Sequence, residues 1–388
     1  MATRLTAEEP GSETGGVAAL KLPLLPDSMN PFRIRGTAMQ PNVLLMAKVV
    51  TVAFLFSGQI VLLSRHFVPF IGFFRHVGSP SAFHLGLELI FLGAAASLFL
   101  NRNVRVACIV LGAVIAVSIM SSMKYYENNR EYTALILILA GLSDPRGDAW
   151  LLRWQLILLY SAAALNKILL ADWRDGHFFN AWFNYVHHAA WAKVSTVLPD
   201  RVLAALLSWA AIVTEVGLAI GFALRRYLPV VMWVGIAYHT TLVFVMNRTF
   251  GMFWVAAPST YLAFVSWPKA PLRVACGRGL GRLRGVTRAL QRIDFEGAFR
   301  WQPSDRPGLE FPLHGTVYHG WRAVLWILLC NPVTYMVFVA LAVLPQPQPR
   351  IAAFGVFVIL GAVAASAIAE RRPRIRGAPA AAAGSARA

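Results

Sequence analysis

Residues 153–176 read RWQLILLYSAAALNKILLADWRDG, an apolar run that carries polar side chains at helical spacing. Seven-residue steps place Arg153, Tyr160 and Lys167 on one seam of a helix, and Asn166 lies beside the end of that seam. About 20 such residues cross a hydrocarbon layer of about 30 Å. The stretch therefore predicts a membrane helix with a polar arc that ends at Lys167.

The rest of the chain has the composition of a membrane protein. Of its 388 residues, 57% are hydrophobic and 14% are charged, and the mean hydropathy is +0.57. About a quarter of the residues of a soluble domain are charged. The net charge of +18 comes from basic residues in loops and tails between apolar runs, which favours membrane-surface electrostatics over a nucleic-acid partner. The three cysteines form no CxxC pair, so thiolate metal sites and thioredoxin-type chemistry lack support.

About ten apolar segments follow one another along the chain. They run over Val43–Leu63, Leu85–Leu100, Val104–Met120, Tyr132–Leu142, Leu151–Leu170, Val202–Ala223, Leu228–Met246, Phe253–Trp267, Val324–Leu344 and Ile351–Ile368. Because backbone groups in lipid must be hydrogen-bonded internally, we predict an all-α, polytopic transmembrane bundle of about 8–10 helices. The fourth and eighth segments are short, and are tilted, re-entrant or extended by flanking polar residues.

Composition divides the chain into five parts. We expect disordered tails over residues 1–40 and 371–388, and no removable targeting segment. Residues 41–268 are expected to form the main transmembrane bundle, and residues 321–370 a C-terminal pair of membrane helices. Residues 269–320 between them are expected to form a basic cytoplasmic loop.

The basic loop carries two patterns. From Arg273 to Arg300, seven arginines alternate with apolar residues at roughly helical spacing. This predicts a basic amphipathic helix that lies on an anionic lipid surface, with a solvated basic linker as the alternative. Trp301–His319 contains three prolines and is expected to be irregular.

The basic residues also predict the orientation. With the N-terminus inside, most of them fall in the tails, the basic loop and alternate short loops, and few remain on the other side. This asymmetry predicts cytoplasmic N- and C-termini in a plasma or inner membrane.

Five ionisable residues stand out within the apolar segments: Lys48, Glu88, Lys167, Glu215 and His239. Each charge at membrane depth costs about 2.5–3.5 kcal/mol on insertion scales, so such groups usually face a cavity or a partner. Lys48 lies near a helix end and can snorkel to water. Glu88 and Lys167 share the same depth and are expected to pair, whereas Glu215 and His239 lie nearer the middle of consecutive helices, where they can hydrogen-bond to each other.

Lys167 admits two interpretations. A buried lysine loses its charge readily and can then act as a general base. Alternatively, its ammonium is neutralised by Glu88 or binds the C-terminal carbonyls of its own helix.

Residues 153–176, with Tyr160, Lys167, Asp172 and Trp173, resemble the signature helix of the horizontally transferred transmembrane (HTTM) family, which includes the vitamin K-dependent gamma-carboxylase. The similarity covers roughly residues 40–268. The supporting matches are Tyr125–Asn129 with Tyr132, then Glu215, Arg225, His239 and Asn247–Trp254.

The resemblance implies a membrane-embedded, lyase- or oxidoreductase-like activity on a quinone of the vitamin K type, because the lysine that matches Lys167 is held to be the base that deprotonates the hydroquinone. Two departures argue against peptide gamma-carboxylation: Arg130 stands where the carboxylases carry a histidine, and the chain has no segment that matches their large lumenal domain. Lys167 is thus the catalytic candidate. The expected binding residues are Tyr160, Asn166, Glu88, Asp172, Trp173, Glu215 and His239.

Other chemistries find little support. His187 and His188 can bind a metal, but no carboxylate completes a ligand pattern, and interfacial histidines beside Trp182 and Trp191 are typical of an aromatic belt. We therefore expect no metal. No P-loop, dinucleotide fingerprint or serine-hydrolase elbow is present in the sequence.

Two function classes remain. The first is an enzyme or binder of a quinone-type or other membrane lipid, with Lys167 in a hydrated cavity on the extracytoplasmic side. The second is a non-catalytic accessory, binding or transport component in which the intramembrane charges only pair. A carboxylate within reach of Lys167 favours the second class.

Overall fold

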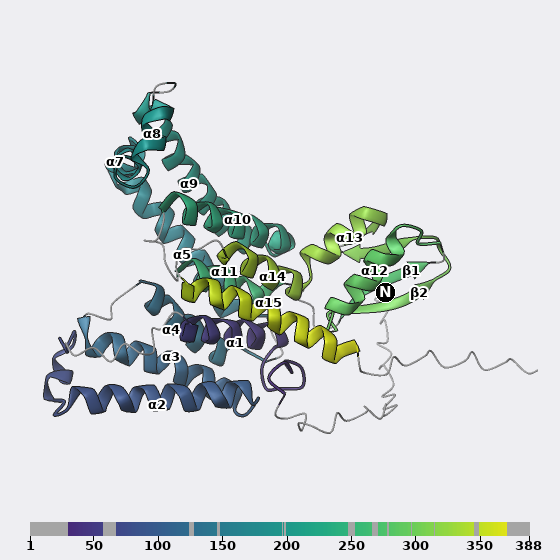
Figure 1. The fold of residues 1–388 in the computed structure, drawn as a ribbon, viewed down its shortest axis with the longest axis horizontal. Helices are drawn as coiled ribbons and strands as arrows, with labels where there is room; N and C mark the ends of the chain where they lie inside the picture. Colours follow the sequence, from purple (N-terminus) through teal and green to yellow (C-terminus); the bar gives the residue numbers. More distant parts are fainter. Residues whose placement is uncertain are drawn as a thin grey trace, which may run out of the picture.

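The computed structural model describes residues 30–56, 67–123, 128–145, 148–195, 197, 199–246, 253–265, 271–277, 279–295, 297–313, 315–344 and 349–370. The described part is mostly helical (Figure 1). Both expected tails lie largely outside these residues. Residues 30–40, which were expected to belong to the N-terminal tail, instead pack on the helices, because the apolar side chains of Ile34 and Met39 are buried there.

The ten predicted apolar segments correspond to helices that share a common hydrophobic core, and the helices of the first eight segments supply most of it. They are α1 (Pro41–Phe56), α2 (Pro80–Phe99), α3 (Val104–Ser121), α4 (Asn128–Leu142), α5 (Trp150–Leu169), α9 (Asp200–Ala223), α10 (Leu228–Met246) and α11 (Phe253–Thr260), which a short 3-10 turn, η6 (Tyr261–Phe264), continues. The two short segments behave differently. Polar residues from Asn128 onward extend the fourth into α4, whereas the eighth is divided into α11 and η6.

Glycines allow α3 and α4 to approach closely. A Cβ atom on Gly112 would lie 2.4 Å from the backbone oxygen of Ala134, and one on Gly141 would lie 2.5 Å from that of Arg105. Small residues of this kind are the usual contact points between membrane helices. In the same helix layer, Gly93 of α2 has open space around it.

Among the described residues, three helices are long and apolar enough to cross a membrane: α2, α3 and Arg201–Ala223 of α9. A fourth candidate is the pair α13 (Gly320–Leu329) and α14 (Pro332–Val343), which bends by 71°. This bend divides the predicted segment Val324–Leu344. Asn331 caps α14 by accepting the N–H of Val333 at 2.8 Å, and Pro332 cannot continue α13.

Lys48 does not snorkel to water, as its position near a helix end suggested. Only 5% of the residue is exposed, and its ammonium donates to Pro31 O at 2.7 Å, Arg33 O at 3.0 Å and Asn101 Oδ1 at 2.8 Å. Asn101 lies in the turn between α2 and α3, and its amide donates to Asn30 O at 2.8 Å. Lys48 therefore fastens the segment before α1 to the α2–α3 turn.

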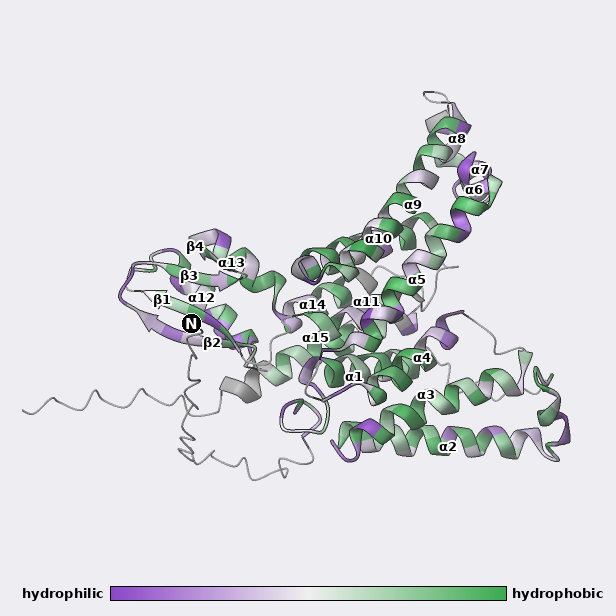
Figure 2. Cartoon of the chain, turned by 180° about the vertical axis from the view of Figure 1, so that it is seen from behind, coloured by the Kyte–Doolittle hydropathy of each residue, from purple (hydrophilic) through white to green (hydrophobic). Residues whose placement is uncertain are grey.

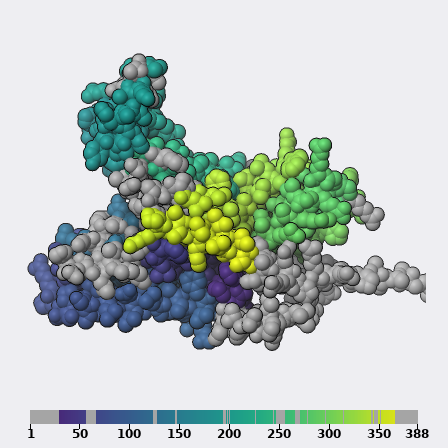
Figure 3. All heavy atoms as spheres, viewed as in Figure 1, coloured from purple at the N-terminus to yellow at the C-terminus, as the bar shows by residue number. Residues whose placement is uncertain are grey.

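Three short helices follow the C-terminal end of α5: α6 (Ala171–Arg174), α7 (His177–Val186) and α8 (His188–Ser195). Phe179, Phe183, Trp191 and Ala204 form a separate small core that joins them to α9. The space-filling view shows α7 to α9 projecting from the rest of the molecule (Figure 3).

Residues 271–319 form a small α/β unit, where a basic and partly irregular loop was expected. The strands β1 (Leu272–Gly277), β2 (Phe299–Ser304), β3 (Leu309–Leu313) and β4 (Thr316–His319) make a sheet in the order β2-β1-β3-β4. The helix α12 (Leu283–Ile293) connects β1 to its parallel neighbour β2. The prediction that Trp301–His319 is irregular is wrong, because alternate apolar residues there, such as Leu309, Phe311 and Leu313, join a common core with α12 and α13.

The amphipathic helix expected between Arg273 and Arg300 is present only in its middle part, as α12. Its apolar residues Leu290 and Val286 face the sheet, so they are not left for lipid. Figure 2 shows hydrophilic residues gathered in this unit and around α6 and α7, whereas the helices between them are largely hydrophobic. The last helix, α15 (Pro349–Glu370), contacts α1, α12 and α14.

Candidate functional site

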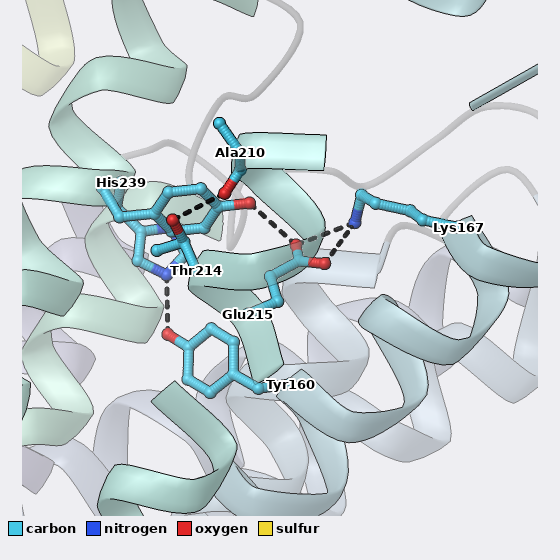
Figure 4. A network of polar contacts seen from close by, with 7 residues as sticks. Tyr160, Lys167, Ala210, Thr214, Glu215 and His239 are labelled. Carbon is cyan, nitrogen blue, oxygen red and sulfur yellow. Dashed lines mark hydrogen bonds and ion pairs between the residues drawn. The ribbon is translucent and has the colours of Figure 1, made fainter. Parts of the chain in front are cut away.

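Lys167 and Glu215 form an ion pair between α5 and α9. The Nζ atom of Lys167 lies 2.7 Å from each carboxylate oxygen of Glu215, and only 16% and 7% of the two side chains are exposed. The two helices run side by side, and the turn between α6 and α7 approaches α9 closely at Gly176, where a Cβ atom would lie 2.3 Å from Ala205 N. This packing places the ammonium directly against the carboxylate (Figure 4).

Two aromatic residues complete the surroundings of this pair. The hydroxyl of Tyr238, on α10, donates to Glu215 Oε1 at 2.8 Å. The Lys167 ammonium lies 5.0 Å from the ring centre of Trp173, within the range of a cation–π interaction. We call Lys167, Glu215, Tyr238 and Trp173 the lysine cluster.

A second network lies next to the lysine cluster and is more deeply buried. The hydroxyl of Tyr160 lies 2.7 Å from His239 Nε2 and also contacts the hydroxyl of Tyr261, and at most 2% of each of these residues is exposed. Gly235 makes room for the Tyr261 ring, because a Cβ atom there would lie 2.8 Å from the ring. We call Tyr160, His239 and Tyr261 the tyrosine–histidine cluster.

The two clusters meet on α10, where Tyr238 and His239 are consecutive residues. Tyr238 bonds to Glu215, and His239 contacts Tyr160. Figure 4 shows the side chains of Lys167, Glu215, His239 and Tyr160 gathered between their helices. The site thus brings cationic, carboxylate, phenol and imidazole groups together between α5, α9 and α10.

The predicted site residues are only partly brought together. Lys167, Glu215, Trp173, Tyr160 and His239 gather in the two clusters.

Glu88, Asn166 and Asp172 stand apart from them. The expected Lys167–Glu88 ion pair is not formed, because α2 packs on α3 and α1 whereas α5 packs on α9. Glu88 is half-buried and has no ion pair within the described ranges, and Asn166 and Asp172 are exposed. Glu215 bonds to Lys167 and Tyr238, where a bond to His239 was expected.

Sequence reasoning missed Tyr238 and Tyr261. Tyr238 precedes His239, and neighbours on a helix point about 100° apart, so the two can face different helices. Tyr261 lies at the start of the short η6 turn, where no periodic pattern indicates an orientation.

No group of three or more histidine, cysteine or acidic side chains in the described part of the chain could hold a metal. His177 and His188 are exposed, and His187 Nε2 lies 3.1 Å from Val245 O.

Comparisons with family models, curated proteins and solved structures gave no match for this chain. The similarity of residues 153–176 to the HTTM signature therefore stays a prediction from the sequence.

Proposed function

We propose that this chain is a polytopic integral membrane protein, with cytoplasmic termini, that binds a quinone-type or similar lipid at the lysine cluster in the extracytoplasmic half of the membrane. The observation that carries the proposal is the Lys167–Glu215 pair, a nearly buried ammonium and carboxylate inside apolar helices. Ionisable side chains at such depth are costly and usually serve a function. The resemblance to the HTTM family supports the same site.

The geometry favours Lys167 as a charged donor in the resting state. An ammonium carries three N–H donors and Lys167 directs it at both oxygens of Glu215, which stabilises the charged form. A remaining N–H can donate to the carbonyl oxygen of a quinone, and the Trp173 ring offers a flat surface beside it. Polar contacts of this kind orient a ligand that is otherwise held by apolar surface.

A role as general base requires one further step. Lys167 must pass a proton to the Glu215 carboxylate, giving a neutral amine and a carboxylic acid, before the amine can take a proton from a hydroquinone. One proton moves from Lys167 to Glu215, a second moves from the hydroquinone to the Lys167 amine, and no electron is transferred. Enzymatic activity of the lyase or oxidoreductase type would rest on this step.

The closed ion pair also favours a second candidate, a non-catalytic membrane component in which Lys167 and Glu215 only join α5 to α9. The carboxylate lies within reach of the ammonium on both oxygens, as expected for a structural pair. A buried pair of this kind can specify helix pairing without binding anything.

The basic α/β unit presents a row of exposed arginines on α12. Arg284, Arg288 and Arg292 follow one another at four-residue spacing on the exposed side of α12, opposite its apolar face. We propose that this stripe faces the anionic lipid surface on the cytoplasmic side, through charge alone because the apolar face packs on the sheet.

Native mass spectrometry of the purified protein, after incubation with menaquinone, tests the main proposal. We expect one bound quinone in the wild type and loss of binding in Lys167→Ala and Glu215→Gln. Glu88→Gln is the matched control, since it neutralises a half-buried intramembrane carboxyl outside both clusters. Binding that survives Lys167→Ala in a folded protein, or that falls equally in Glu88→Gln, would overturn the proposal, and loss of folded protein in Lys167→Ala alone would favour the structural role.

A further inference from the structure

Two arginines and one aspartate meet at the opposite end of α5 from Lys167. Nη2 of Arg225, in the turn between α9 and α10, lies 3.0 Å from Asp148 Oδ2. Nη2 of Arg153, in the first turn of α5, lies 3.5 Å from the same oxygen. One carboxylate therefore stands between two guanidinium groups, and this arginine cluster carries one uncompensated positive charge.

The arginine cluster is incompletely satisfied. Only 7% of Arg153 is exposed, yet its buried Nε has no hydrogen-bond partner among the residues that the structure describes, and the contacts of Asp148 Oδ2 there are ion pairs without hydrogen-bond geometry. A buried donor without a partner costs about 1–3 kcal/mol, and more if the group is charged. Arg225 differs, because 64% of its side chain is exposed. The cluster thus joins a buried guanidinium with an unmet donor to a second guanidinium that reaches the surface.

The surroundings of the cluster indicate what it can bind. The α5 helix begins beside it with Ala149 at the N-cap, which offers no side-chain acceptor to the free N–H groups of the first turn. Trp150 and Trp154 in the same turns are 49% and 50% exposed. Half-exposed tryptophans at the end of an apolar helix are typical of the level of lipid headgroups.

We propose that the arginine cluster binds the phosphate of an anionic phospholipid headgroup. Guanidinium groups match phosphate oxygens with paired N–H donors, and a monoanionic phosphodiester balances the uncompensated charge. Asp148 holds the two guanidiniums apart and orients them, and the two tryptophans lie against the glycerol and upper acyl region. A phosphatidylcholine headgroup fits less well because its choline adds a positive charge beside Arg225.

This site is separate from the lysine cluster and from the arginine stripe on α12. Its chemistry is that of a phosphate group, which a lipid or free phosphate can supply. The position beside half-exposed tryptophans on a membrane helix favours the lipid.

Native mass spectrometry from nanodiscs of equal phosphatidylglycerol and phosphatidylcholine content tests the proposal. We expect wild-type protein to retain phosphatidylglycerol preferentially, and Arg225→Gln to lower that retention about tenfold, as the loss of one charged hydrogen-bonding group predicts. Arg102→Gln is the matched control, because Arg102 is exposed in the α2–α3 turn and its loss removes the same charge elsewhere. Arg153→Lys keeps the buried charge but loses the forked geometry, and we expect it to fold and to bind lipid weakly.

Two results would overturn the proposal. One is an equal fall in lipid retention in Arg225→Gln and Arg102→Gln, which indicates unspecific attraction by net charge. The other is a rise in melting temperature with millimolar inorganic phosphate that equals the rise with phosphatidylglycerol, since the ligand is then free phosphate. Quinone binding at Lys167 is measured independently, so failure here leaves the proposed function untouched.

Discussion

Lys48 Nζ donates to Asn101 Oδ1 at 2.8 Å, and the same Asn101 side chain donates to Asn30 O. One buried ammonium and one amide thus hold together α1, the segment before it and the α2–α3 turn. Asn101 has a φ of 57°, a left-handed conformation that asparagine tolerates better than most residues. The backbone conformation of the α2–α3 turn and its contact with Lys48 therefore both depend on Asn101.

The first prediction concerns this contact. We expect Lys48→Met to lower the free energy of unfolding by about 2 kcal/mol, because three partly buried acceptors lose a charged donor. Asn101→Gly keeps the backbone conformation and removes the side chain, so it should cost less. Unfolding in mixed detergent micelles measures both, and the double variant should lose less than the sum. Full additivity would contradict the contact.

The second prediction concerns the α3–α4 interface. Gly112→Ala places a methyl group against Ala134 O and should destabilise the protein by about 1–3 kcal/mol through overpacking. Gly93→Ala in α2 is the control, because open space surrounds Gly93 and alanine is the better helix former. Melting temperatures of the two purified variants compare them. A shift of the same size in both would argue against the close approach of α3 and α4.

The third prediction is a pH dependence in the α/β unit. Burial raises the pKa of Asp294 from 3.8 to about 6, although its carboxylate accepts the N–H of Ala298 at 2.6 Å, that of Phe299 at 3.1 Å and the indole N–H of Trp301 at 3.1 Å. The folded state then holds a proton that the unfolded state releases between pH 3.8 and about 6. Over that window the stability of the unit should fall as pH rises, by at most about 3 kcal/mol, and stay level above it.

The indole N–H resonance of Trp301 reports this titration directly. We expect it to move with a midpoint near pH 6 and to stop moving in Asp294→Asn. Trp301→Phe assigns the resonance. A titration that persists in Asp294→Asn would assign the proton to another group.

The fourth prediction separates the two roles of the Lys167–Glu215 pair. Lys167→Met should cost about 3–5 kcal/mol of stability, because it leaves Glu215 buried without its cation. The exchanged pair, Lys167→Glu with Glu215→Lys, should recover most of the stability. If the site binds a quinone, the exchanged pair should still fail to bind, since the ammonium has left Trp173. Recovery of both properties would mean that charge pairing alone matters.

Much of the helical layout could be predicted from hydropathy, because apolar runs such as Leu228–Met246 begin and end where the helix does. The break at Asn331-Pro332 carried a visible signal, a cap followed by proline, inside a run that hydropathy alone treats as continuous. The strands over residues 299–319 were harder to predict. Their prolines suggested irregular structure, yet Pro303 and Pro312 are exposed positions of the sheet.

The partner of Lys167 could not be predicted from depth alone. Glu88 and Glu215 are both carboxylates within apolar helices, and only the packing of α5 on α9 decides between them. Such packing depends on contacts far apart in sequence, such as Gly176 against Ala205, which no local pattern reveals. The same reason hides Tyr261, which reaches Tyr160 across 101 positions of the chain.

Strand β4 ends at His319 and helix α13 begins at Gly320, so no flexible linker separates the sheet from the bent helix pair that follows. The sheet and α13 also share one hydrophobic core, which includes Phe311 of β3 and Val324 of α13. We therefore expect the sheet and α13 to move as one rigid body. The distance between spin labels on Val317 and Leu325 should then stay the same whenever the α/β unit moves relative to the rest of the protein.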